Sequence, residues 1–436
     1  MRRLLAVALG ALVLWSCSPG GRGPELQIIS PHWQGIQAEF GPAFERHWRE
    51  KTGNDIRVVW RDMGGTADNL RYIKSEFAKR PEGIGIDLFF GGGLDPYRQL
   101  KDLGLLASCE ISAEILDAIP PDLGGVPLYD PDGTWYGTAM SGFGIIYNRQ
   151  MLSRISVDEP LTWQDMADPA YFTWVGSGDP RHSGTVHMMY EIILQAYGWE
   201  RGWEVITALA ANTRNVVSNA GDIPLSVSAG HIAAGTAIDF YAWTQIEQVG
   251  ADRVGFVLPD GLTVINPDSV AVLKGAPDPD AARAFVEFVL SKEGQKLWYL
   301  EAGAEGGPAR NSLLRMPLRI DLYEDYADLS PVKMNPFAQQ EGFTYDSDLG
   351  TARFNVLNDL IGAIIVDCHD DLVRAWSAAV RAGRTEEVLP QLAVPPVTED
   401  ELTELGIAGI GDPIARNEKI AEWVRFARDK YRRLSR

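Results

Sequence analysis

Apolar residues early in the chain alternate between two spacings, which predict strands and helices in turn. Short apolar runs at 26–29, 56–60 and 86–90 predict buried strands. Between them, apolar residues at three- and four-residue steps over 36–48 and 70–77 predict amphipathic helices. This β-α-β-α-β order favours a parallel sheet with helices on both faces.

Two short loops follow the predicted strands, and ligands of such sheets bind beyond the carboxyl ends of the strands. The first loop begins with Ser30-Pro31-His32. The second loop is Gly91-Gly92-Gly93, where the absence of side chains leaves backbone N–H groups bare. Both loops are therefore candidate parts of a ligand site.

The later pattern predicts a second α/β region and then helices. Residues 138–148 predict a long extended segment, 200–212 a helix, and 233–241 a buried strand. From about residue 311 onward the pattern is helical, with a broad apolar stripe at 354–365.

The N-terminus has the pattern of a secretory signal. Arg2 and Arg3 precede an apolar run of about 11 residues, which is too short to span a membrane. The run ends in Leu14-Trp15-Ser16-Cys17, which resembles the lipobox of bacterial lipoproteins. We expect residues 1–16 to be a signal peptide and 17–24 a tether lipidated at Cys17, which would anchor the chain to the membrane. An ordinary cleaved signal is the alternative.

Composition narrows the class of protein. The chain has 436 residues and a net charge of -19, so binding to nucleic acid is not expected. Three cysteines exclude a disulfide scaffold. Beside Cys17, the pair Cys109 and Cys368 could form a disulfide or remain two buried thiols.

Catalytic motifs are missing from the sequence. It lacks a nucleophile elbow, a His-Glu-x-x-His metal motif and a Walker lysine, and Gly91-Gly92-Gly93 departs from the dinucleotide fingerprint. His182 and His187 are five residues apart, which is weak support for a metal site. We therefore expect no enzyme, cofactor or metal, although a Ser-His-Asp triad cannot be recognised from sequence.

Small residues precede a helical pattern at Ser183-Gly184-Thr185. The first N–H groups of a helix lack acceptors and attract anions. Taken alone, the same residues also fit a plain helix cap.

Several segments in order resemble the periplasmic solute-binding proteins of ABC importers, of the ferric-iron, thiamine and phosphonate type. The resemblance reaches from about Glu25 to Arg310. It is carried by Glu50-Lys51-Thr52-Gly53, Ile86–Gly93, Gly144–Asn148, Thr162–Pro169, Asp179–Thr185, Gly202-Trp203, Leu209–Asn212 and Ser291–Gln295.

The resemblance implies an α/β fold of two lobes with a ligand cleft and two hinge crossings. Lobe one would comprise residues 25–140 and 263–310, and lobe two residues 141–262. Residues 311–436 would be a C-terminal helical extension, which we expect to pack on lobe one.

The resemblance also implies ligand-binding residues in the cleft. Matching positions are Ser30, His32, Gly92, Gly93, Ser141, Asp179, Ser183, Gly184, Thr185, Ser218, Asn219, Asp239 and Tyr241. The ferric members use adjacent tyrosines, whereas Phe240 precedes Tyr241 here, which argues against iron. The helix start at Ser183 favours a solute with a phosphate, phosphonate or carboxylate group.

The implied function is delivery of a small polar solute to an ABC importer permease, with the cleft closing by hinge motion. The expected protein is a periplasmic or cell-surface monomer with a lipid anchor. An extracytoplasmic enzyme or a ligand sensor on the same scaffold is the alternative. An enzyme would need a titratable pair in the cleft, such as Asp179 with His182 or Asp239.

Overall fold

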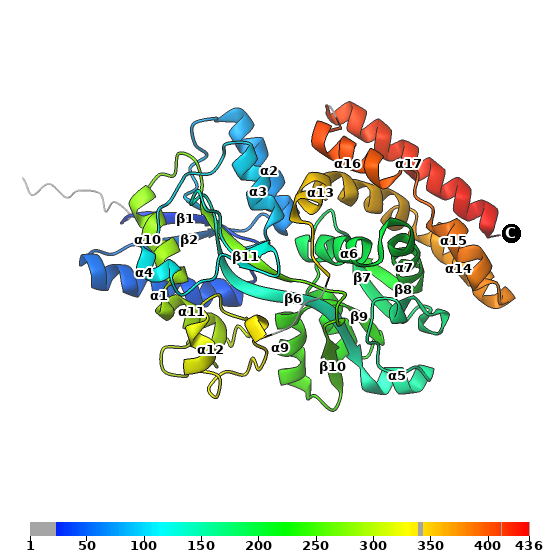
Figure 1. The fold of residues 1–436 in the computed structure, drawn as a ribbon, viewed down its shortest axis with the longest axis horizontal. Coiled ribbons are helices and arrows are strands. Elements are labelled where there is room, and N and C mark those ends of the chain that lie inside the picture. Colours follow the sequence, from blue (N-terminus) through cyan, green and yellow to red (C-terminus); the bar gives the residue numbers. More distant parts are fainter. Residues whose placement is uncertain (1–22, 339–342, 411, 436) are drawn as a thin grey trace, which may run out of the picture.

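A computed structural model describes residues 23–338, 343–410 and 412–435. The predicted signal peptide 1–16 and lipidation site Cys17 lie outside these residues and stay predictions. The described chain forms two α/β lobes, and a group of helices lies along the second lobe (Figure 1).

The first part of lobe one follows the predicted order of strands and helices. Its elements are β1 (Glu25–Ile29), α1 (Gln34–Thr52), β2 (Arg57–Arg61), α2 (Thr66–Lys79) and β3 (Leu88–Phe90). β1 lies between β2 and β3 and runs parallel to both. α1 ends where Gly53 adopts φ of 73°, a left-handed conformation that glycine permits.

One long strand carries the sheet from lobe one into lobe two. β6 (Tyr136–Asn148) pairs with β11 (Ile265–Val272) as far as Gly142, and with β9 (Ala234–Ile238) from Phe143 onward. All of β6 is buried. The strand order is β2-β1-β3-β11-β6-β9-β7-β8, with β10 (Val254–Val257) also on β6; β7 is Val175–Gly178 and β8 is Thr213–Val217.

The sheet is mixed, which differs from the all-parallel sheet that the early pattern favours. β11 runs antiparallel to both of its neighbours, β3 and β6. A strand that returns from the other lobe enters this sheet in the opposite direction, so the parallel arrangement ends at β3.

The helices of lobe two follow its strands. They are α5 (Arg149–Ile155), α6 (Gly184–Tyr197), α7 (Trp199–Asn212), α8 (Asp222–Ser228) and α9 (Asp239–Val249). α9 begins directly after β9, and α6 follows β7 after a short loop. The first turns of both helices are thereby placed at the edge of the sheet that faces lobe one.

The remaining elements of lobe one surround the sheet. They are α3 (Asp95–Asp102), α4 (Ala113–Leu116), β4 (Asp122–Leu123), β5 (Val126–Pro127), α10 (Pro279–Leu290), α11 (Lys292–Tyr299) and α12 (Asp321–Asp325). The segment after α11 stays on this lobe, because the Arg315 N–H bonds the Trp298 carbonyl and the Ser330 hydroxyl bonds the Tyr299 carbonyl.

The C-terminal helices correct one expectation. They are α13 (Ser347–Ile361), a π-helical turn (Gly362–Val366), α14 (His369–Ala382), α15 (Thr385–Ala393), α16 (Glu399–Ala408) and α17 (Pro413–Leu434). They pack mainly on α6 and α7 of lobe two, and α13 also contacts α3 of lobe one (Figure 1). The buried Trp376 indole N–H, for example, donates to the Asn212 side chain of α7.

These helices lie on lobe two because the chain crosses between the lobes once more after residue 338. The resemblance did not imply this crossing. Residues 336–338 still lie on lobe one, where Phe337 contacts the Tyr323 ring. By Asp346 the chain exchanges hydrogen bonds with Gln195 of α6. The chain thus passes between the lobes a third time before α13 begins.

Two further features concern membrane and redox properties. Among the described residues, Ser347–Val366 is long and apolar enough by composition to cross a membrane, but 72% of its apolar window is buried within the fold, as in a core helix.

Cys109 and Cys368 are free and buried, so of the two alternatives the structure has two lone thiols. Burial raises the pKa of each thiol to about 11.

Candidate functional site

One cavity between the lobes, here called the inner cavity, has a volume of about 90 Å³. Lobe one and the crossing strands contribute one side, lobe two the opposite side, and α13 a third. The lining residues include His32, Gly92, Gly93, Asp95, Ser141, Asp268 and Arg315 on the first side, Gly184, Thr185, Phe240 and Tyr241 on the second, and Phe354 on α13.

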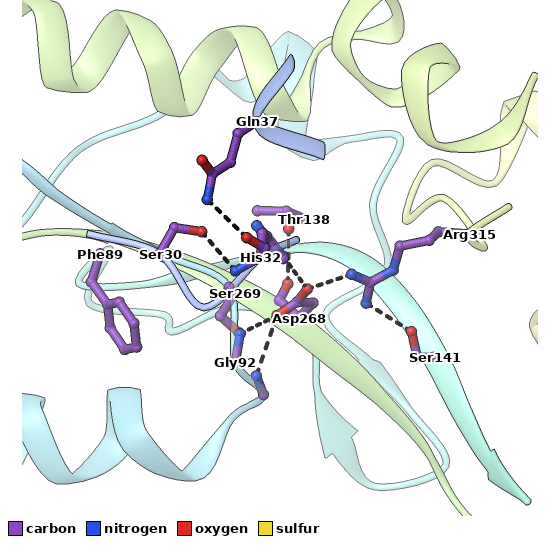
Figure 2. Close-up of polar contacts among 12 residues, drawn as sticks. Ser30, His32, Gln37, Phe89, Gly92, Thr138, Ser141, Asp268, Ser269 and Arg315 are labelled. Atoms are coloured by element: carbon purple, nitrogen blue, oxygen red, sulfur yellow. Dashed lines mark hydrogen bonds and ion pairs between the residues drawn. The ribbon is translucent and has the colours of Figure 1, made fainter. Parts of the chain in front are cut away.

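A buried network centred on Asp268 forms the floor of this cavity (Figure 2). One carboxylate oxygen, Oδ2, lies 2.7 Å from His32 Nε2 and 2.5 Å from Arg315 Nη1. The other, Oδ1, accepts the backbone N–H groups of Gly92 and Gly93. The bare N–H groups expected in the glycine loop are therefore taken by Asp268.

Arg315 links this network to the hinge. Its Nη2 donates to the Ser141 hydroxyl at 2.7 Å, and its guanidinium carbon lies 4.5 Å from the centre of the Phe240 ring. The side chain is 2% exposed, yet its Nε has no partner among the described residues. A buried cation with an unused donor is thus held against the cavity.

Electrostatics fix the charge state of the acid in this network. Burial alone would raise the pKa of Asp268, but the charge of Arg315 and the contact with His32 lower it well below its usual range. Asp268 is therefore a carboxylate at neutral pH, and it balances Arg315 rather than adding negative charge.

The N-terminus of α6 lies on the opposite side of the inner cavity. Ser183 caps the helix, because its hydroxyl accepts the Val186 N–H. Gly184 and Thr185 occupy the first helical positions and line the cavity. Gly184 lies so near lobe one that a Cβ there would come within 3.0 Å of Thr66 Cβ.

The cleft widens outward into a second space of about 510 Å³, here called the outer cavity. Ser183, Ser218 and Asn219 of lobe two line it, and Asp62 and Asp68 of lobe one face them. At its edge the two lobes touch. A Cβ on Gly65 would lie 1.9 Å from the His182 carbonyl oxygen, and Arg71 Nη1 donates to the Arg181 carbonyl at 2.9 Å.

The structure brings ten of the thirteen predicted ligand-binding residues to these two cavities. Seven line the inner cavity: His32, Gly92, Gly93, Ser141, Gly184, Thr185 and Tyr241. Ser183, Ser218 and Asn219 line only the outer one. Their roles in binding a solute stay predictions.

The other three predicted residues have positions that serve the fold. The Ser30 hydroxyl accepts the His32 N–H and thereby holds that loop. Asp179 is paired with Arg181 at 2.8 Å, although His182 Nε2 lies 4.0 Å away. Asp239 accepts the N–H groups of Gly142 on the hinge strand and of Phe240.

Asp239 is nevertheless unusual as an acid. Its complete burial raises its pKa to about 7, although two backbone N–H groups act in the opposite direction. It does not line either cavity.

Sequence reasoning missed the two residues at the centre of the network, Asp268 and Arg315. In the sequence, Asp268 marks only the end of the second hinge crossing. Arg315 lies just beyond the segment that carries the resemblance, so no motif includes it. An ordinary arginine in a loop gives no sequence signal of burial; only the fold brings it beside residues from positions 32, 141 and 268.

Metal-binding groups are also sparse. Within residues 23–338, 343–410 and 412–435, no three His, Cys, Asp or Glu side chains are grouped so that they could hold a metal ion. His187 is buried against the Phe354 ring and bonds Asn358, whereas His182 lies at the edge of the outer cavity. The two histidines thus do not form a joint site.

Residues 84–313 match the family described as bacterial extracellular solute-binding protein. That segment covers more than half of the chain and includes both hinge strands and all of lobe two. The chain belongs to this family. Solved structures of periplasmic binding proteins share the two-lobed fold of this solute-binding protein.

Individual relatives support the same fold with differing coverage. The phosphoglycerate transport regulatory protein PgtC of Salmonella typhimurium is 33% identical over 164 residues, which is 38% of this chain and 40% of PgtC. The iron uptake protein A1 of Synechocystis is 25% identical over 312 residues, covering 66% and 80%. The alignment with PgtC thus spans less than half of that relative.

A solved structure with the same architecture is the periplasmic binding protein AfuA of Actinobacillus pleuropneumoniae, with fructose-6-phosphate bound. It has a TM-score of 0.61 and 20% identity, covering 82% of this solute-binding protein and 99% of AfuA. At this identity the likeness concerns the fold alone.

Proposed function

We propose that this protein binds a small polar solute with an anionic group between its lobes, and delivers it to the permease of an ABC importer. The observation that carries the proposal is the meeting of two groups of N–H donors in one cavity. Arg315 lies on the floor of the inner cavity, and the first turn of α6 faces it from the other lobe.

Each feature favours an anion for a separate physical reason. The first N–H groups of a helix have no intrahelical acceptor, and the helix dipole makes its N-terminus positive. A guanidinium group stays charged and offers several donors in one plane to an oxyanion. A solute that contacts both lobes also stabilises the closed form, to the extent that it binds that form better.

The chain's negative net charge does not oppose this proposal. The charge of -19 is spread over the surface, whereas recognition in a cleft depends on nearby groups. Inside the cavity, Asp268 is already balanced by Arg315 and contacts His32.

Relatives are named for phosphorylated solutes and for iron, and the residues of this cleft favour the phosphorylated solute. PgtC is named for phosphoglycerate, and the AfuA structure has fructose-6-phosphate bound; both compounds are phosphate monoesters. A1 is named for iron uptake, but here Phe240 precedes Tyr241, and burial raises the pKa of Tyr241 to about 12. Its phenol is therefore protonated at neutral pH.

The lipid anchor is part of the same proposal. Acylation of Cys17 would hold the protein at the outer face of a membrane, where a permease can receive the solute. Cys17→Ser should release the protein from membranes in fractionation without changing solute affinity. Retention of this variant on the membrane would refute the anchor.

Native mass spectrometry of protein purified without refolding tests the proposed solute directly. We expect an added mass that corresponds to a small phosphate or carboxylate compound and that disappears on mild unfolding. A bound neutral compound or a bare metal ion would contradict the anionic assignment. In a thermal shift screen, a ligand at one hundred times its Kd should stabilise the fold by about 2.7 kcal/mol.

A ligand sensor is a second candidate, because the printed name of PgtC describes a transport regulatory protein. A sensor in its closed form would bind a membrane receptor rather than a permease. In cells that express the importer constitutively, deleting a delivery protein abolishes solute uptake. Deleting a sensor leaves that uptake intact and instead abolishes induction of the transport genes.

A further inference from the structure

Helix α13 of the C-terminal extension is firmly attached to lobe two. Arg353 makes three contacts of 2.8–3.1 Å with the Glu191 carboxylate of α6, and both side chains are fully buried. One turn further on, the Asn358 side-chain oxygen lies 2.8 Å from His187 Nδ1. Separating a buried ion pair is costly, so α13 moves with lobe two as one body.

The contacts of α13 with lobe one are of another kind. The Thr351 hydroxyl donates to the Asp95 carboxyl at 2.9 Å, and the Asn355 side-chain amide donates to Gln99 at 3.0 Å. Arg98 pairs with Asp348 at the solvent edge. All three partners lie on α3. Water can replace such bonds when two surfaces separate, so this contact can open without a large loss.

The same helix also closes one side of the inner cavity. Phe354 lies between Arg353 and Asn355 in the sequence, and it lines the cavity together with Asp95 and Pro96 of α3. One wall of the cleft therefore comes from the C-terminal extension, which lies outside the segment 25–310 that carries the resemblance. Opening the cleft must break the α13–α3 contacts, and closing it must form them.

We propose that α13 is a latch: lobe two carries it onto α3, where its polar contacts hold the cleft closed and Phe354 completes the cavity wall. The latch depends on the proposed function in one respect only, which is that the inner cavity is the solute site. It predicts that part of the closing free energy comes from the protein itself. The solute then needs to supply less of the free energy that closes the cleft.

Distances between spin labels in solute-free protein test the latch. Ala78→Cys on α2 and Ala229→Cys at the end of α8 place labels on exposed positions of the two lobes, while Cys109 and Cys368 are buried. In this background, Thr351→Val with Asn355→Ala should raise the ratio of open to closed molecules on the order of tenfold. This figure follows from the loss of two neutral hydrogen bonds.

A matched variant separates the latch from general effects on the extension. Thr403→Val with Asn417→Ala makes the same chemical changes in α16 and α17; Thr403 bonds only the Glu399 carbonyl of its own helix in the described structure. We expect this control to keep the wild-type distances. Equal distributions for all three proteins would overturn the latch.

The latch stays testable if the double variant folds poorly. Asn355 is exposed, so Asn355→Ala alone is expected to fold and to raise the open fraction about fivefold. An unchanged distribution in that variant would overturn the proposal as well. Because no solute is added, failure of the latch is distinguishable from failure of the proposed anion site.

Discussion

The inner and outer cavities of the cleft use different chemistry. In the inner cavity, charged side chains from distant parts of the chain satisfy one another in a buried network. The outer cavity is lined on lobe two by hydroxyl and amide groups from short continuous segments, several of them exposed. The comparison teaches that the inner network sets charge and position, whereas the outer groups add adjustable hydrogen bonds.

The largest effect should come from Arg315→Met, which removes the cation of the inner network. Asp268 would remain as a buried carboxylate, and unfolding free energy should fall by about 3–5 kcal/mol. Affinity for an anionic solute should fall at least about a hundredfold. Chemical denaturation and calorimetric titration measure the two losses.

Arg319→Met is the matched control for this prediction. Arg319 lies four residues later, pairs with Asp321 and lines neither cavity. Its replacement should leave solute affinity unchanged. Equal affinity losses in both variants would show that Arg315 has no special role.

Asp95→Asn should change how stability depends on pH. Burial raises the pKa of Asp95 to about 7, with Glu191 adding to the increase. Between about pH 4 and 7, the unfolded chain ionises this group while the folded chain keeps its proton, so wild-type stability falls as pH rises.

The Asp95→Asn variant has no carboxyl group to ionise at this position, so it loses this pH dependence. Between pH 4 and 8, its stability relative to wild type should improve by a few kcal/mol, at about 1.4 kcal/mol for each pKa unit. Urea denaturation at both pH values measures the difference. A constant difference between the two proteins would mean that Asp95 titrates normally.

Gly184→Asp should weaken solute binding by placing a carboxylate at the first turn of α6. The new charge suits a helix N-terminus, so the fold should keep its stability while an anionic solute is excluded. We expect a loss of about tenfold to a hundredfold in affinity, measured by calorimetric titration.

Gly184→Asn has the same size without the charge, so it isolates the electrostatic part. If both variants lose affinity equally, the effect is crowding against Thr66, where a Cβ would come within 3.0 Å. A larger loss for the aspartate is the result that supports anion recognition.

The smallest effect should come from the outer cavity. Ser218→Ala removes one exposed hydroxyl, and affinity should fall about fivefold, as expected for one hydrogen bond. Stability should stay within about 0.5 kcal/mol of wild type. Ser153→Ala, at an exposed serine outside both cavities, should change neither quantity. A loss as large as that of Arg315→Met would erase the distinction between the cavities.

The sequence predicts those features that depend on local patterns. The strands β1 to β3, the long strand β6 and the helices α1, α2 and α7 follow from apolar spacing, and the Ser183 cap follows from residue type. The lobe-two side of the outer cavity is predictable because its residues lie in short contiguous segments of the chain.

The inner network and the place of the extension could not be predicted in this way. Asp268 and Arg315 pair across 47 positions, and each is ordinary in its own surroundings. The apolar stripe of α13 predicts that the helix is packed, but not against which lobe. The buried pair of Arg353 and Glu191, 162 positions apart, and the contact of Asn358 with His187 tie it to lobe two.

The most direct test of the central claim compares solutes that differ only in a phosphate group. Calorimetric titration of wild type and Arg315→Met with fructose 6-phosphate and fructose, and with 3-phosphoglycerate and glycerate, measures the contribution of the anion. We predict that wild type binds a phosphorylated member and not its neutral or less charged counterpart, and that Arg315→Met loses this binding. Equal binding within each pair, or binding that Arg315→Met retains, would contradict it.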